Sequence, residues 1–168
     1  MVLNLLGGAS DPRAGKSKFP RVYNLSDFGI TANVTCQPNI YTKVGEVTVP
    51  AGQLVTFGIG NTAGGVDTRE VAYIRFDDTS GSQLHGTIRL VLADPNEVRK
   101  IVVAEQRTEK FSASQTERDK GFKLGEYPIV AKEDSKLIIE YYPDSASAVT
   151  IDYDGTNTKI LMPVTVYQ

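Results

Sequence analysis

Side chains able to do chemistry are few and widely spaced in this chain of 168 residues. It has one histidine, His85, and one cysteine, Cys36, so neither a multi-histidine metal site nor an internal disulfide can form. A nucleophilic triad needs a base beside its nucleophile, and a single histidine argues against one. We therefore expect no catalytic residue, no cofactor and no metal site. Cys36 is interpreted as a small buried apolar residue.

Three loops carry residue types that bind ions in other proteins. They are the adjacent carboxylates Asp77 and Asp78, the acidic segment 152–157, and the glycine-rich segment 61–68. Calcium would need further oxygen ligands, and a phosphate loop would need a lysine and a following helix, which the sequence does not supply. We interpret all three segments as polar turns.

The composition is that of a soluble globular protein, with 40% hydrophobic residues, 23% charged residues and a net charge of −2. This charge is too small to indicate a nucleic-acid or membrane partner for the chain as a whole. No run approaches the roughly 20 apolar residues that span a bilayer. The apolar patch near the start is too short for a secretory signal. We expect one domain of ordinary size, without signal peptide or transmembrane segment.

Residues 1–30 are expected to form an irregular N-terminal arm outside the core, because prolines and glycines interrupt any helix or strand period. Between positions 11 and 21 the sequence has four basic residues and only one carboxylate, Asp11. We predict that these basic side chains contact nucleic acid, an internal membrane surface or a neighbouring subunit. A solvated tail is the alternative. The residues are Arg13, Lys16, Lys18 and Arg21.

Residues 31–168 alternate apolar and polar side chains with period two, which is typical of strands with one buried face. The clearest unit surrounds Pro50-Ala51-Gly52, where we predict a hairpin with Pro50 at the second turn position and Gly52 left-handed. Pro163 in the last strand indicates an edge or a bulge. Further strands are predicted at 32–36, 70–77, 84–93, 124–131, 136–142, 149–153 and 158–167.

Residues 95–106 fit two structures. Asp94 as a cap, Pro95 at the first helical position and Glu97 are typical of a helix start. A type I turn with Pro95 second, joining two strands, is the alternative. The β-branched run Ile101-Val102-Val103 favours strands, so we expect the hairpin.

Two other features stay open. Segment 105–126 is expected to extend the preceding strand and then form an exposed loop or a short helix. Asn24 and Asn33 each fit the N-glycosylation pattern, and the sequence leaves their modification undecided.

Eight or nine strands and no clear helix predict an all-β fold, a two-sheet antiparallel sandwich. An eight-stranded jelly roll spanning residues 31–168 is the expected form, and an immunoglobulin-like sandwich is its rival. The basic arm, the turn 49–53, the strand entry 134–139 and a last strand ending near Gln168 resemble the single jelly-roll capsid proteins of icosahedral viruses.

This resemblance implies a structural virion protein, a capsid (coat) subunit that self-assembles through its β-sandwich loops and N-terminal arm. Its partners would be other copies of itself and other capsid proteins, with no small-molecule substrate. Its expected location is the virion, assembled in the host cytoplasm. The alternative is a non-catalytic binding module, either carbohydrate-binding or a virion decoration protein. A sugar site would need the outward tyrosines Tyr73, Tyr142 and Tyr167 on one face.

Overall fold

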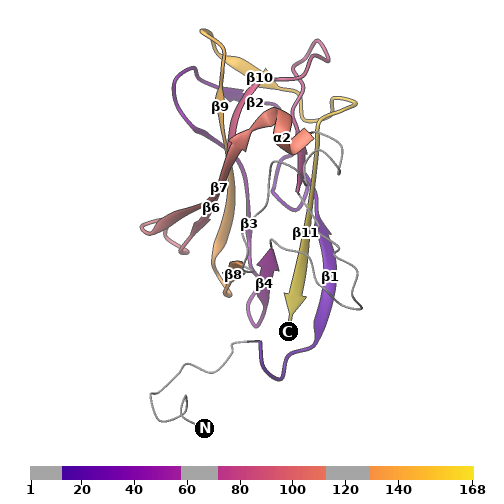
Figure 1. Ribbon diagram of the computed structural model, residues 1–168, viewed down its shortest axis with the longest axis vertical. Helices are drawn as coiled ribbons and strands as arrows, with labels where there is room; N and C mark the ends of the chain where they lie inside the picture. Colours follow the sequence, from indigo (N-terminus) through magenta and orange to yellow (C-terminus); the bar gives the residue numbers. More distant parts are fainter. Residues whose placement is uncertain (1–12, 58–71, 113–128) are drawn as a thin grey trace.

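The computed structural model describes residues 13–57, 72–112 and 129–168. Within these ranges the chain forms eleven strands and one short helix (Figure 1). The elements are β1 (Lys18–Tyr23), β2 (Val34–Cys36), β3 (Thr42–Thr48), β4 (Leu54–Phe57), β5 (Tyr73–Arg75), β6 (Gly86–Ala93), β7 (Lys100–Arg107), α2 (Thr108–Ser112), β8 (Ile129–Ala131), β9 (Lys136–Pro143), β10 (Val149–Ile151) and β11 (Lys159–Tyr167).

Eight strands form a sandwich of two antiparallel sheets (Figure 1). One sheet has the order β1-β11-β4-β8, and β5 also pairs with one end of β11. The other sheet has the order β3-β9-β6-β7. Short strands β2 and β10 pair with each other at the top of Figure 1.

The pairing of these eight strands is nested along the chain. The outermost pair is β1 with β11, the next is β3 with β9, then β4 with β8, and the innermost is β6 with β7. This is one long antiparallel hairpin wrapped into two sheets, which is the jelly roll. The predicted all-β sandwich and its jelly-roll form are confirmed, and the order differs from that of immunoglobulin domains.

The core lies between the two sheets and is built from alternate residues of each strand. On the central strands β9 and β11, alternate side chains are buried against the opposite sheet, and each apolar one contributes about 1.5–3 kcal/mol. They are Leu137, Ile139 and Tyr141 of β9 and Ile160, Met162, Val164 and Val166 of β11.

The predicted hairpin around Pro50-Ala51-Gly52 is wrong, because β3 and β4 lie in different sheets. The turn itself exists. Gln53 N–H donates to the Pro50 carbonyl (3.1 Å), and Gly52 has a φ of 77°. Pro50 therefore occupies the first turn position, not the second, and the turn carries the chain from one sheet to the other. Alternation identifies a buried face, but it does not identify the neighbouring strand.

The predicted arm of residues 1–30 is wrong from Lys18 onward. β1 pairs with β11 along its whole length, and the side chains of Tyr23, Phe28 and Ile30 are buried. β1 was missed because five of its six residues are exposed, so its sequence shows no alternation. Residues 1–12 of the predicted arm lie outside the described residues.

Phe28 joins the segment after β1 to the opposite sheet. Its carbonyl accepts a hydrogen bond from Glu46 N–H of β3 (2.9 Å), and its ring packs edge-on against Tyr23. A Cβ on Gly45 would lie 2.7 Å from the Phe28 carbonyl oxygen and from Ile30, so glycine is required for this close approach.

Pro163 lies in a central strand, so the predicted edge is wrong. On one side β11 pairs with β1, where Pro163 faces Val22. On the other side β5 pairs with residues 159–161 and β4 with residues 164–167. Pro163 thus falls between two pairings, where its missing donor is tolerated.

The β6–β7 hairpin confirms the strand interpretation of residues 95–106. Glu97 N–H donates to the Asp94 carbonyl (3.0 Å), which puts Pro95 second in the turn as predicted. The Asp94 carboxylate accepts from Val98 N–H (2.7 Å). The predicted strand extension and short helix are present as β7 and α2, and residues 113–128 lie outside the described ranges.

Candidate assembly surfaces

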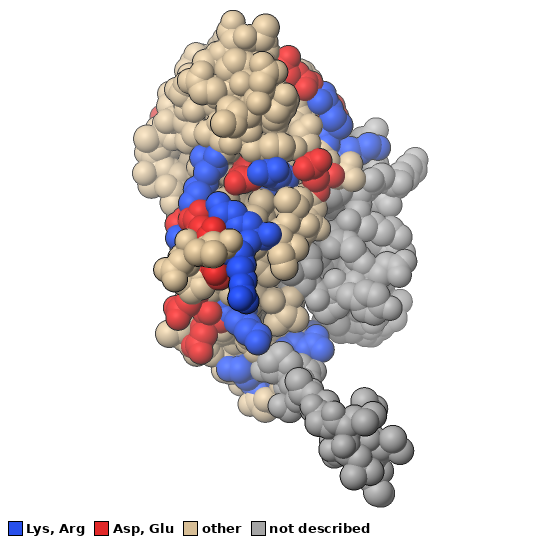
Figure 2. Space-filling view, turned by 90° about the vertical axis from the view of Figure 1, so that its left-hand side faces the viewer, with Lys and Arg blue, Asp and Glu red and all other residues tan. Residues whose placement is uncertain are grey.

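The outer face of the β3-β9-β6-β7 sheet carries charges of both signs. Side chains alternate across a strand, so the residues between the buried ones point away from the core. Figure 2 shows blue and red side chains interleaved along this side of the molecule. Their ion pairs connect strands that are distant in the sequence.

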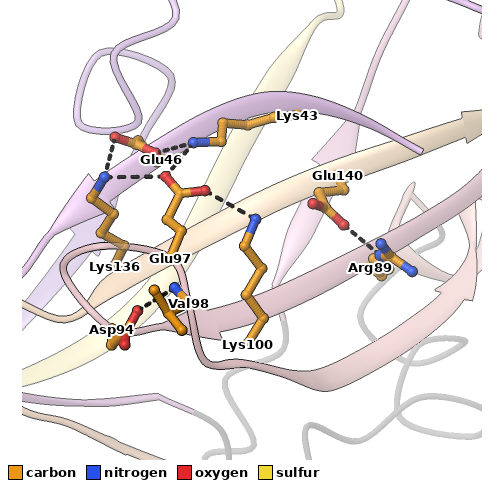
Figure 3. Close-up of polar contacts among 9 residues, drawn as sticks. All are labelled: Lys43, Glu46, Arg89, Asp94, Glu97, Val98, Lys100, Lys136 and Glu140. Carbon is orange, nitrogen blue, oxygen red and sulfur yellow. Dashed lines mark hydrogen bonds and ion pairs between the residues drawn. The ribbon is translucent and has the colours of Figure 1, made fainter. Parts of the chain in front are cut away.

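Glu97 is the centre of the largest of these clusters. Its carboxylate lies 2.6 Å from Lys43 Nζ, 2.9 Å from Lys100 Nζ and 3.1 Å from Lys136 Nζ (Figure 3). Hydrogen bonds from Lys43, then from the other two lysines, hold the pKa of Glu97 far below its ordinary value. Glu46 completes the cluster, 2.5 Å from Lys43 and 3.4 Å from Lys136.

The cluster fastens the β6–β7 turn to the rest of the sheet. Lys43 comes from β3 and Lys136 from β9, whereas Glu97 comes from the turn. Val91, Ala93 and Ile138 form a small buried cluster on this sheet, separate from the main core. The turn is therefore held in one place by three charge-assisted contacts.

A second polar group lies farther along the same face. The guanidinium of Arg89 pairs with the Glu140 carboxylate (Figure 3). It also lies 3.8 Å from the centre of the Tyr41 ring. Tyr142 packs against Tyr41 with ring centroids 5.3 Å apart and ring planes inclined at 56°. Most charge on this face is thus already matched within the chain.

At the far end of β7, Arg107 links the strand to the β9–β10 connection and to α2. Its guanidinium pairs with the carboxylate of Asp144 and lies 3.5 Å from that of Glu109. Glu109 also lies 2.8 Å from Nδ1 of His85. The single histidine therefore takes part in an exposed structural contact.

The outer face of the β1-β11-β4-β8 sheet is different, because it is largely uncharged. Met162, Val164 and Val166 point inward, so the alternate residues of β11 and their cross-strand partners point outward. Among these positions in β1, β11 and β4, only Lys18 and Lys159, at opposite ends, are charged. We call the others that are not buried the uncharged face: Pro20, Val22, Leu161, Pro163, Thr165 and Tyr167. Leu54 and Thr56 of β4 are buried and do not belong to it.

Two residues of the uncharged face are strongly exposed. Val22 has 49% of its surface accessible and Leu161 has 39%. Large exposed apolar side chains that adjoin one another are typical of surfaces that meet other proteins. The uncharged face is therefore one candidate assembly surface.

The predicted basic contact residues lie beside this face, and Lys16 and Arg21 are among those engaged within the chain. The Lys16 ammonium donates to the Gly52 carbonyl (3.0 Å), and the Arg21 guanidinium pairs with Asp27 (2.7 Å). Lys18 is exposed at the start of β1. Arg13 begins a turn in which its carbonyl accepts a hydrogen bond from Lys16 N–H (3.2 Å). The structure thus places all four residues in or just before β1.

The other residues singled out by sequence have structural roles in the described chain. Asp77 is buried, and its carboxylate pairs with Arg75 (2.8 Å), while Asp78 accepts hydrogen bonds from Ser80 and Ser82. Asp152 and its neighbours form a turn closed by Gly155 N–H on the Asp152 carbonyl (3.3 Å). The glycine-rich segment 61–68 lies outside the described residues.

The three tyrosines of the carbohydrate-binding alternative do not share a face. Tyr73 and Tyr167 are adjacent in sequence to Ile74 and Val166, whose side chains are buried in the core. Because side chains alternate along a strand, both tyrosines lie on the outer side of the β11 sheet. Tyr142 lies on the outer side of the other sheet, packed against Tyr41. The structure therefore offers no aromatic platform built from these three.

Asn24 and Asn33 use their side-chain carbonyls within the fold. Asn24 Oδ1 accepts from Ser26 N–H (2.9 Å), and Asn33 Oδ1 accepts from Tyr153 N–H (3.1 Å).

In the part of the chain that the structure describes, no helix is long and apolar enough to cross a membrane. The same residues contain no group of three or more His, Cys, Asp or Glu able to hold a metal.

Sequence reasoning missed the Glu97 cluster. Two of its pairs, Lys43–Glu46 and Glu97–Lys100, are three residues apart, but no short spacing joins these two pairs to each other or to Lys136. Glu97 has a positive φ (56°) because it lies in the turn. No local sequence motif indicates that its carboxylate meets Lys43 and Lys136.

Comparison with solved structures finds close agreement in fold. VP17, a capsid protein of bacteriophage P23-77, superposes with a TM-score of 0.60, covering 90% of this chain and 96% of VP17. The chain has the fold of a viral capsid protein. The complex of VP16 and VP17, the two major capsid proteins of the same phage, gives a TM-score of 0.59 over 89% of this chain and 98% of the matched chain. Sequence identity is 8% and 9%, so these matches show the fold. No family model and no curated protein matches by sequence.

Proposed function

We propose that this chain is a capsid subunit, a structural protein of a virion without catalytic activity. The observation that carries the proposal is the jelly-roll match to VP17, which extends over 90% of this chain and 96% of VP17. A fold hosts many functions, so the surfaces must supply the remaining support. One sheet face with matched charges and one that is largely uncharged fit a subunit that is solvated on one side and packed on the other.

The uncharged face is the proposed contact with neighbouring subunits. Burial of charged groups carries a large desolvation penalty, whereas uncharged side chains gain about 25 cal/mol per Å² of apolar surface removed from water. Val22 and Leu161 would supply most of that surface because they are the most exposed apolar residues on this face. VP16 and VP17 form a complex of two capsid proteins. By analogy, we propose other copies and a second capsid protein as partners here.

The basic residues near β1 are proposed to contact an acidic neighbour: nucleic acid, an internal membrane surface or another subunit. Lys18 is exposed, and the exposed Arg21 lies near it. Contacts of this kind weaken as salt is added, because counterions screen exposed charges beyond about 10 Å at 0.1 M. The proposed location is the virion.

Sedimentation velocity of the full chain tests the proposal. We expect assemblies larger than dimers in the wild type, and loss of the largest species in Leu161→Lys. Ile40→Lys is the matched control because Ile40 is also exposed (57%) and lies outside both sheets. The proposal is overturned if the wild type forms nothing larger than a dimer. The role of the uncharged face is overturned if both variants assemble like the wild type.

A further inference from the structure

A jelly roll has four sheet edges, and three of them are guarded in this protein. Unpaired edge strands attract other chains, and proteins protect them with cover, prolines or short length. The edge of β3 is covered by the segment after β1, where Glu46 N–H is bonded to Phe28. The β1 edge contains Pro20, which has no backbone donor, and β8 has three residues in the described part of the chain.

Within the described ranges, the edge formed by β7 has no cover, no proline and no short length, although it carries a bulge and Lys100. β7 has eight residues and no proline, and it ends the β3-β9-β6-β7 sheet among the described residues. The strand and the turn before it expose three large apolar side chains: Val98 (81%), Ile101 (65%) and Val102 (48%). Exposure of this size on an edge strand marks it as a site of pairing with another chain.

The Glu97 cluster fixes this edge in place before any partner arrives. It ties the turn to Lys43 and Lys136, and it also ties Lys100 at the start of β7 (Figure 3). A surface that is already ordered loses less conformational entropy when it binds. The hairpin is therefore built to present Val98 and the edge of β7 in a constant geometry.

The charges along β7 match a second copy of the same strand. A two-fold contact requires one patch to be complementary to itself. If two β7 strands run antiparallel with Lys100 opposite Glu105 of the second copy, Ile101 meets Ala104 of that copy. The two-fold axis repeats both contacts, which gives two ion pairs at the ends and apolar pairs between them.

A bulge in β7 makes this register consistent with the side-chain directions. Val102 pairs with Val91 and Ala104 with Leu90, so Val103 is an extra residue in the strand. Across this bulge the alternation reverses. Lys100 and Glu105 then point to the outer side, opposite Ala93 and Arg89 of β6. In a regular strand, residues five apart would point to opposite faces and could not meet in this way.

We propose that β7 pairs antiparallel with β7 of a second copy about a two-fold axis, joining two four-stranded sheets into one of eight strands. This contact deepens the proposed function, since it names one of the surfaces through which the subunits would assemble. It is separate from the uncharged face on the other sheet. Its partner is this chain itself.

Charge reversal tests the contact. We expect Glu105→Lys to raise the dimer dissociation constant about tenfold, because symmetry makes the reversal act twice. Lys100→Glu also removes the contact of Lys100 with Glu97, so its effect should be at least as large. The double variant restores the opposite charges, and we expect it to restore the dimer. Lys132→Glu, an exposed lysine in the turn before β9, is the matched control and should dimerise like the wild type. Sedimentation equilibrium measures each constant against the 18.3 kDa monomer.

Cysteine pairing tests the register without altering charge. Cys36 is buried, so a cysteine placed on β7 is the accessible thiol among the described residues. Oxidation of a mixture of Ile101→Cys and Ala104→Cys should give a disulfide-linked dimer, since directly opposite residues have Cβ atoms about 4.5–5.5 Å apart. Ile101→Cys alone should give much less, because the two copies of residue 101 are offset along the strands.

The inference is overturned if the wild type has no dimer, if the single reversals dimerise like the wild type, or if the cysteine mixture links no better than either variant alone. Its failure is distinguishable from failure of the proposed function. Large assemblies that survive both reversals would support a capsid role and refute the β7 contact. Dimers that obey the reversals but never grow would support the contact and refute the capsid role.

Discussion

Phe28→Ala tests whether the segment after β1 belongs to the core. The ring is 1% exposed and packs at 89° against Tyr23, with centroids 6.2 Å apart. Replacement of a buried phenylalanine by alanine costs about 3–5 kcal/mol, because apolar burial is lost and a cavity remains. In a chain of this length that lowers the melting temperature by roughly 6–20 °C.

Phe19→Ala is the matched control, since Phe19 lies on β1 and is 48% exposed. With half of its surface already in water, its removal should cost about 1 kcal/mol. Urea unfolding followed by far-ultraviolet circular dichroism measures both differences, with the slope against urea expected to stay constant. A loss for Phe28→Ala no larger than that for Phe19→Ala would refute the placement of this segment in the core.

Three further outcomes follow from single residues. Above pH 4.5, the ordinary pKa of the Glu97 carboxyl, the wild type should unfold at higher urea than Glu97→Gln. The difference between the two urea midpoints should shrink as the pH falls towards the depressed pKa of Glu97 in the folded protein. A difference that grows in acid would contradict the cluster. Burial raises the pKa of the Cys36 thiol to about 11 and leaves the thiol inaccessible. A thiol reagent at about pH 8 should therefore label only urea-unfolded chains, and fast labelling of the native chain would contradict this. Gly86→Ala should cost about 1–3 kcal/mol or more in chemical unfolding, because a Cβ there would lie 2.1 Å from the Tyr142 carbonyl oxygen, and an unchanged midpoint would refute that contact.

The sequence predicted the strands well where burial alternates and poorly where it does not. β11 buries alternate residues, so its period of two is visible in the sequence. β1 packs through Tyr23 and otherwise through its backbone pairing with β11, which leaves no side-chain signal. The region from Lys18 to Ile30 was therefore mistaken for part of an arm.

Which strands lie side by side could not be predicted from local pattern. The turn at Pro50 looks like a hairpin turn, yet it connects two sheets, because pairing of β3 and β4 is set by β9 and β11 far along the chain. The Asp94–Glu97 turn was predicted correctly because Pro95 and the β-branched run after it act locally. The ion pairs of Glu97 depend on the completed sheet, so they appear only in the structure.

Native mass spectrometry of the full chain at micromolar concentration tests the proposed capsid role most directly. Assembly through two separate surfaces predicts a series of species that extends beyond the dimer and grows with concentration. A spectrum that holds only the 18.3 kDa monomer, or a dimer that never extends, would contradict that role.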